Sequence, residues 1–211
     1  MKKFLSYIFP FTKKIISPFN GTLELNYTNG KKVLDSANAN YSYGSLQRVL
    51  KYALQHTDLT GVKTVLLLGL GGGSVIETLL TEFKYTGSIT AVDIDPVIIE
   101  LAKNEFGIQE DNELKVICSD ARTYLESTNE KFDLIIVDLF IDNRIPTPFF
   151  NLEFWKLLQK ASDKKGKIIF NTIEETSSEM EVIKNYMKEN FELKLLKKVE
   201  ETNTVYIWNA K

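Results

Sequence analysis

The feature that most constrains the fold is an apolar run that ends in glycines, at residues 65–73. Residues 65–68 are all valine or leucine without polar alternation, which is typical of a strand buried on both faces of a parallel sheet. Three of the glycines that follow are Gly69, Gly71 and Gly73. Glycines allow a tight turn and a close approach of the backbone to a ligand, and apolar residues at helical spacing come next. The run therefore predicts a strand, turn and helix N-terminus that bind a nucleotide, with a plain tight turn as the alternative.

Carboxylates close the predicted strands on the same side. Asp93 ends the second strand, where dinucleotide-type folds place the acid that binds a ribose. Asp120 and Asp138 end the third and fourth strands. We expect these three acids to gather at one sheet edge, where they suit a ribose, an adenine amine or a cationic sulfonium better than a pyrophosphate. Asp95 precedes Pro96 and is interpreted instead as a helix N-cap.

Composition limits the function classes. The 211 residues are 44% hydrophobic, enough for one full core with a small appendage, and the net charge of −2 predicts no nucleic-acid partner. Cys118 and His56 are the only cysteine and the only histidine. No internal disulfide framework and no zinc site are therefore expected, and no other metal is predicted. Cys118 lies in an apparent buried strand, so we expect it to fill the core.

The N-terminus is basic and aromatic over residues 1–11. Its apolar run is broken by Pro10, and no small-residue cleavage site follows, so we expect the segment to be retained. Packing against the domain or a partner subunit is favoured over contact with a membrane surface. No stretch has the length of a membrane span, and a cytoplasmic location is expected.

The remaining pattern predicts an N-terminal hairpin before an α/β domain. Strands at 22–27 and 31–35 flank an Asn-Gly turn. We divide the chain into residues 1–42, an N-terminal segment with this hairpin, and residues 43–211, the main domain. Further elements are expected from apolar spacing: helices over 46–54, 97–106 and 152–161, and strands over 167–171, 193–199 and 203–208. A capping box at Thr176 and Glu179 predicts one more helix, which buries Met180, Ile183 and Met187.

Four motifs together resemble a known family. They are the glycine run from Gly69 to Gly73 and the segments at 92–95 (VDID), 119–121 (SDA) and 132–138 (FDLIIVD). They are similar to class I S-adenosylmethionine-dependent transferases, and within these to the spermidine synthase group. The resemblance implies a Rossmann-like fold with a seven-stranded, mostly parallel sheet and a C-terminal antiparallel hairpin.

The resemblance also implies roles for individual residues. S-adenosylmethionine or its decarboxylated form would be held by seven residues. Gly69, Gly71 and Gly73 would lie under its amino-acid and ribose portion, and Asp93 would bind the ribose. Ile94 would contact adenine, and Asp120 and Ala121 would lie at the adenine edge. Asp138 would face the sulfonium and the incoming nucleophile, with Tyr43 as a second catalytic residue. Asp142 and Tyr41 would contact a small-molecule acceptor. By analogy with the group, a homodimer is expected.

Two departures from the group decide the expected reaction. Tyr43 is followed by Gly44 and Ser45, where aminopropyltransferases carry residues that anchor a diamine's charge. The second acid of their motif after the fourth strand is displaced to Asp142, and its proline is missing. We therefore expect methyl transfer to a small acceptor, with aminopropyl transfer as the alternative. A non-catalytic protein that binds S-adenosyl ligands and, more distantly, a nicotinamide oxidoreductase are the further alternatives.

Overall fold

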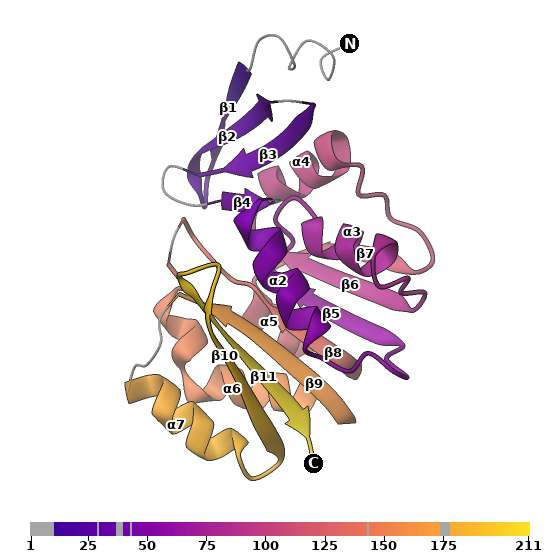
Figure 1. Ribbon diagram of the computed structural model, residues 1–211, viewed down its shortest axis with the longest axis vertical. Coiled ribbons are helices and arrows are strands. Elements are labelled where there is room, and N and C mark those ends of the chain that lie inside the picture. Colours follow the sequence, from indigo (N-terminus) through magenta and orange to yellow (C-terminus); the bar gives the residue numbers. More distant parts are fainter. Residues whose placement is uncertain (1–10, 29, 37–39, 43, 143, 174–177) are drawn as a thin grey trace.

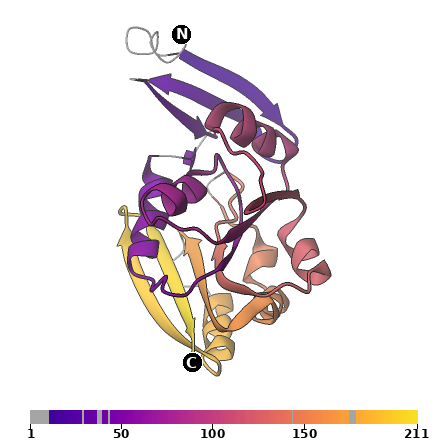
Figure 2. The same ribbon diagram turned by 90° about the vertical axis from the view of Figure 1, so that its right-hand side faces the viewer.

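The protein is described here by a computed structural model, which covers residues 11–28, 30–36, 40–42, 44–142, 144–173 and 178–211. Two sheets organise the chain (Figure 1). The smaller one is antiparallel, and its strands run in the order β1 (Phe11–Ser17), β2 (Gly21–Thr28), β3 (Lys31–Asp35) and β4 (Asn40–Ser42). In two perpendicular views it lies beyond α4 (Pro96–Phe106), at the opposite end of the molecule from the C-terminus (Figure 2).

The small sheet contains the predicted hairpin and two further strands. The pairing of Leu25 with Leu34 lies within the β2–β3 ladder and confirms the hairpin. Strands β1 and β4 were not predicted. In β1 two consecutive lysines interrupt the apolar alternation, and Ile16 is 73% exposed, so its pattern does not resemble a half-buried strand. The predicted packing of residues 1–10 lies outside the described residues.

The larger sheet has seven strands in the order β10-β11-β9-β8-β5-β6-β7. Their bounds are β5 (Thr64–Leu68), β6 (Ser88–Asp93), β7 (Leu114–Cys118), β8 (Phe132–Val137), β9 (Ser162–Thr172), β10 (Phe191–Val199) and β11 (Asn203–Ala210). Strands β5 to β9 pair in parallel, whereas β11 is antiparallel to β9 and to β10. The predicted fold class is confirmed. The strand order reverses between β5 and β8, and such a switch point is where open α/β sheets bind ligands.

Helices cover both faces of this sheet, which explains the continuous apolar runs of its strands. In β5, Val65 and Leu67 pack on one core, and Leu66 and Leu68 pack on the other. The first core includes α2 (Ser45–Gln55), α3 (Ser74–Thr81) and part of α4; the second includes α5 (Ala121–Ser127), α6 (Leu152–Ala161) and α7 (Ser178–Met187). Helix α5 was not predicted. The expectation for Cys118 was wrong, because β7 is an edge strand and this cysteine is exposed.

A carboxylate at the start of α4 fastens the small sheet to the main domain. The N-cap residue Asp95 is fully buried and accepts a hydrogen bond from the Val97 amide over 2.9 Å, as predicted for a cap. The same carboxylate accepts from the Ser17 hydroxyl and, over 2.6 Å, from the Asn20 side-chain amide. One carboxylate therefore serves both the helix and the loop that follows β1.

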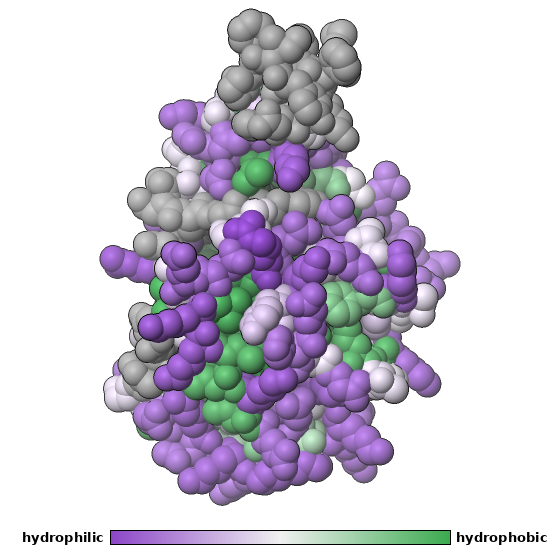
Figure 3. All heavy atoms as spheres, viewed as in Figure 1, coloured by the Kyte–Doolittle hydropathy of each residue, from purple (hydrophilic) through white to green (hydrophobic). Residues whose placement is uncertain are grey.

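The surface is largely hydrophilic, with an apolar patch over β10 and β11 on the face shown in Figure 3. Leu193 of the edge strand β10 is 38% exposed. Within the described ranges, no helix combines the length and the apolar content that crossing a bilayer requires.

Candidate functional site

A cavity of about 610 Å³ opens at the C-terminal ends of the parallel strands, around the switch point between β5 and β8. Most of the predicted site residues line it: Gly69, Gly71, Asp93, Ile94, Asp120, Ala121, Asp138 and Asp142. The expected gathering of Asp93, Asp120 and Asp138 at one sheet edge is thus present. Ile94 is 37% exposed at this cavity, which leaves an apolar surface for a flat ring to contact.

Three predicted site residues are not placed in the cavity. Gly73 is absent from its lining; this glycine has φ +83° at the start of α3, where an added Cβ would meet the Ile108 side chain. Tyr43 lies outside the described residues. Tyr41 belongs to β4, but its side chain is not among those described.

Asp93 holds the glycine turn as well as facing the cavity. Its Oδ2 accepts hydrogen bonds from the backbone N–H groups of Leu70 over 3.0 Å and Gly71 over 3.3 Å, and its Oδ1 accepts from the Asp95 N–H over 2.9 Å. Burial raises the pKa of Asp93 to about 6, against the opposing effect of these three bonds. A carboxylate has about four lone-pair sites, so a further donor such as a ribose hydroxyl can still bind.

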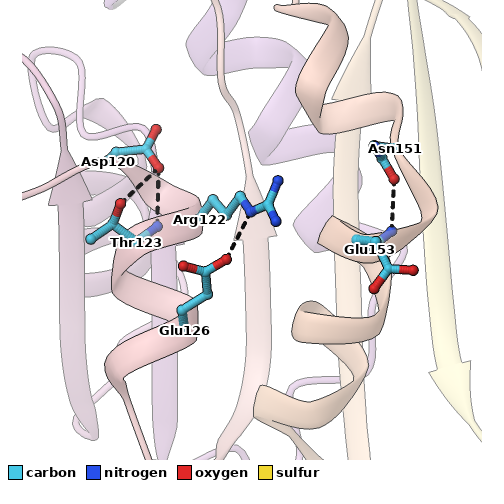
Figure 4. Close-up of polar contacts among 6 residues, drawn as sticks. All are labelled: Asp120, Arg122, Thr123, Glu126, Asn151 and Glu153. Carbon is cyan, nitrogen blue, oxygen red and sulfur yellow. Dashed lines mark hydrogen bonds and ion pairs between the residues drawn. The ribbon is translucent and has the colours of Figure 1, made fainter.

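The turn from β7 into α5 carries a carboxylate and a cation that both line the cavity. Within the described part of the chain, this cation is the only one in the lining. Asp120 caps α5 and accepts from the Thr123 N–H over 3.0 Å (Figure 4). Arg122 extends from α5 toward the start of α6, and its Nε donates to Glu126 over 2.8 Å. The guanidinium is thus partly neutralised by a neighbour on its own helix.

Asp138 is held by residues that the sequence patterns did not identify. Its Oδ1 accepts from the Asn171 side-chain amide over 2.9 Å, and Asn171 accepts in turn from the Asn203 amide over 3.0 Å. Burial raises the pKa of Asp138 to about 6, and the bond from Asn171 opposes this rise. A polar residue that ends a buried strand was the available signal for Asn171, whereas Asn203 reaches the site only through the pairing of β11 with β9.

The segment after β8 forms a further part of the cavity wall. Asp142 has φ +54° and accepts from the Ser36 hydroxyl over 2.6 Å, which ties this wall to the end of β3. Pro146, Pro148 and Phe149 also line the cavity, so the loop between β8 and α6 forms part of its wall. Across the described residues, no group of three or more His, Cys, Asp or Glu side chains is arranged to hold a metal ion.

The charges of the cavity lining suit a cationic ligand. Four carboxylates line it among the described residues, against the guanidinium of Arg122. Gly69 and Gly71 of the glycine turn, with Ile94, fit the ribose and adenine parts of an S-adenosyl compound, and Asp138 lies on the other side of the switch point. The residues present therefore fit a nucleoside that carries a sulfonium.

Comparison with known proteins identifies relatives of this chain. Residues 49–206 match the family model described as the spermine/spermidine synthase domain. A polyamine aminopropyltransferase of Saccharolobus solfataricus is 30% identical over 148 residues, which are 59% of this chain and 49% of that protein. Other curated relatives bear the same name, and the chain spans half or less of the length of those it matches.

Solved structures share the fold. Human methyltransferase-like protein 13, solved in complex with SAH, has a TM-score of 0.66 at 22% identity, covering 80% of this chain and 83% of that one. A probable spermidine synthase from Corynebacterium glutamicum has a TM-score of 0.64 at 17% identity, covering 95% and 77%. At these identities the likeness concerns the fold alone.

The relatives confirm the predicted resemblance and contradict the expected reaction. Methyl transfer was preferred because Gly44 and Ser45 replace residues that anchor a diamine, yet the curated relatives are named polyamine aminopropyltransferases. Neither this replacement nor the displacement of the second acid to Asp142 excluded aminopropyl transfer, since Asp142 still lines the cavity and presents negative charge to it.

Proposed function

Because the chain belongs to the spermine/spermidine synthase domain family, we propose that it transfers an aminopropyl group from decarboxylated S-adenosylmethionine to a small amine. The observation that carries this proposal is the acidic lining of one cavity by Asp93, Asp120, Asp138 and Asp142. Both reactants are cations, a sulfonium with an amine and an acceptor amine, and negative walls with apolar surroundings attract and hold them.

The half of the cavity formed by β5, β6 and β7 would hold the nucleoside. Gly69 and Gly71 let the backbone approach the ligand, and the Asp93 carboxylate, already fixed by the turn, would accept from the ribose hydroxyls. Ile94 and Ala121 would contact the adenine faces, and Asp120 would accept from its amine. The donor supplies an electrophilic carbon next to a positively charged sulfur.

The other half would hold the acceptor. Asp138 ends β8 at the switch point and has a pKa of about 6, so it is ionised at neutral pH and able to accept a proton. It would orient the amine and take its proton as the nitrogen lone pair forms a bond to the carbon. The electron pair of the broken C–S bond stays on sulfur, giving neutral methylthioadenosine. Asp142 would attract a second amine of the acceptor, and we retain Tyr43 and Tyr41 as proposed contacts.

The test is a direct assay of the purified chain. Decarboxylated S-adenosylmethionine is supplied with putrescine, cadaverine or spermidine, and both methylthioadenosine and the new polyamine are quantified by mass spectrometry. We expect equal amounts of both products, and the rates at which both form should fall together by roughly 10²- to 10⁴-fold in the Asp138→Asn variant. S-adenosylhomocysteine formed from S-adenosylmethionine, with no product from the decarboxylated donor, would contradict the proposal.

We also propose that the chain works in the cytoplasm as a homodimer. The apolar patch over β10 and β11 supports an association of this kind, since exposed apolar patches commonly mark contact surfaces (Figure 3). Sedimentation velocity over a range of concentrations tests the assembly, and a monomer at all of them would contradict it.

A further inference from the structure

A directed chain of hydrogen bonds leads from the cavity wall to Asp138. The Thr202 hydroxyl donates to Asn203 Oδ1 over 3.0 Å, and Asn203 Nδ2 donates to Asn171 Oδ1 over 3.0 Å. Asn171 Nδ2 then donates to Asp138 Oδ1 over 2.9 Å. Asn171 is fully buried, whereas Thr202 and Asn203 line the cavity. The chain thus crosses three strands of the sheet, since Asn203 begins β11, Asn171 lies near the end of β9, and Asp138 follows β8.

The direction of this chain depends on the charge of Asp138. An ionised carboxylate only accepts hydrogen bonds, so it requires the NH₂ end of Asn171. The oxygen end of Asn171 then points to Asn203 and requires the NH₂ end of that amide. A protonated carboxyl can donate, and it no longer selects one orientation of the two amides. The arrangement is therefore the one that matches an ionised Asp138.

The surroundings of Asp138 leave Asn171 with a distinct electrostatic role. Burial disfavours the ionised form, and among the described side chains Asn171 is the one whose hydrogen bond favours it. Strand β5 presents backbone here, with the Leu68 carbonyl accepting from the Asp138 N–H over 2.8 Å. Among the residues that the structure describes, the other charged side chains that line the cavity are Asp93 on β6, Asp120 and Arg122 at the start of α5, and Asp142 in the loop after β8.

We propose that Asn171 is a positioning residue that keeps the Asp138 carboxylate ionised and aimed into the cavity, and that Asn203 fixes Asn171 in the orientation this needs. The inference rests on the proposed function, in which Asp138 takes the proton of the acceptor amine. The positioning role of Asn171 and Asn203 has one measurable consequence. Removing either amide raises the pH at which Asp138 loses its proton, even though neither residue carries a charge.

The experiment measures the pKa of Asp138 directly and independently of turnover. Protein labelled with ¹³C at aspartate carboxyl carbons is titrated by NMR, with Asp138→Asn used to assign the signal. Asn171→Leu has a similar shape and lacks the donor, and we expect it to raise the pKa of Asp138 by about one to two units. Asn203→Ala, on the less buried wall, should raise it by a smaller amount. In the transfer assay, the acidic limb of the pH profile should shift upward by the same interval.

Thr204→Val is the matched control. Thr204 neighbours Asn203 on β11, is fully buried, and its hydroxyl has no hydrogen-bond partner within the described structure. Valine keeps its shape, so neither the pKa of Asp138 nor the pH profile should change. An Asp138 pKa unchanged in both Asn171→Leu and Asn203→Ala would overturn the inference. A native chain without transferase activity would refute the proposed function instead, because the NMR titration gives its result in either case.

Discussion

A Cβ atom on Gly69 would lie 2.1 Å from the carbonyl oxygen of Asp138. The ends of β5 and β8 meet here, where the Asp138 N–H also donates to the Leu68 carbonyl over 2.8 Å. Gly69 has φ +94°. Any other residue would have to separate the two strand ends at the point where the cavity opens, so the glycine serves the sheet as well as a ligand.

The first prediction compares two glycines of similar conformation. Gly61 has φ +76° but an added Cβ would meet nothing within 4 Å. Gly61→Ala should therefore cost only the left-handed strain, roughly 1–2 kcal/mol of unfolding free energy. Gly69→Ala adds the clash with Asp138 and should cost roughly 2–5 kcal/mol in total. Urea unfolding followed by circular dichroism measures both, and equal losses would show that the strand ends separate freely.

The second prediction concerns Asp93. Asp93→Ala removes a charged acceptor for the ribose and the partner of the Leu70 and Gly71 N–H groups. Affinity for methylthioadenosine should fall by roughly 1.5–3 kcal/mol, measured by isothermal titration calorimetry. Asp58→Ala, which removes an exposed carboxylate outside the cavity lining, is the control and should leave affinity unchanged. Unaltered binding by Asp93→Ala would place the ribose elsewhere.

The third prediction is that Asp138→Asn lowers activity and raises stability. Turnover should fall roughly 10²- to 10⁴-fold because the proton acceptor is lost. An asparagine oxygen can still accept from Asn171 while the buried charge disappears, so Tm at pH 7.5 should rise by a few degrees. Scanning calorimetry checks the stability. A lower Tm would mean that the carboxylate contributes more to packing than its burial costs.

The fourth prediction is that the rise in Tm caused by Asp138→Asn depends on pH. The pKa of Asp138 is about 6 in the folded chain and roughly 3.9 when unfolded. Between these values the folded state binds more protons, so the native chain loses stability from this group as pH rises from about 4 to about 6. The difference in Tm between Asp138→Asn and the native chain should therefore grow across this window and level off above it. A constant difference from pH 4 to pH 7.5 would exclude the raised pKa.

The proposed nucleoside half of the site, together with Asp138, was predictable because the signals are local. Three of the parallel strands are mainly apolar and lead into an acid: Asp93 ends β6, Asp120 comes two residues after β7, and Asp138 directly follows β8. These acids could therefore be assigned to one edge without knowing any contact. The N-cap role of Asp95 is local in the same way. Predictions from such local patterns hold because the backbone geometry of a strand or helix end fixes where the residue lies.

The acceptor half depends on pairings between distant segments. Asn171 meets Asn203 only because β9 pairs with β11, and Ser36 meets Asp142 across 106 positions of the chain. No spacing rule brings such residues together. The preference for methyl transfer failed for the same reason, since it judged the acceptor wall from two sequence motifs, the residues after Tyr43 and the position of Asp142, and not from everything that the fold places there.

The bonds between Asp93 and the glycine turn also determine how the site meets its ligand. Because the carboxylate already fixes the N–H groups of Leu70 and Gly71, the loop is preorganised and little conformational entropy is lost when a nucleoside binds. The nucleoside should then bind with little rearrangement of the glycine turn. Any slow, ligand-dependent closing step would have to come from the wall that Asp142 and Phe149 form.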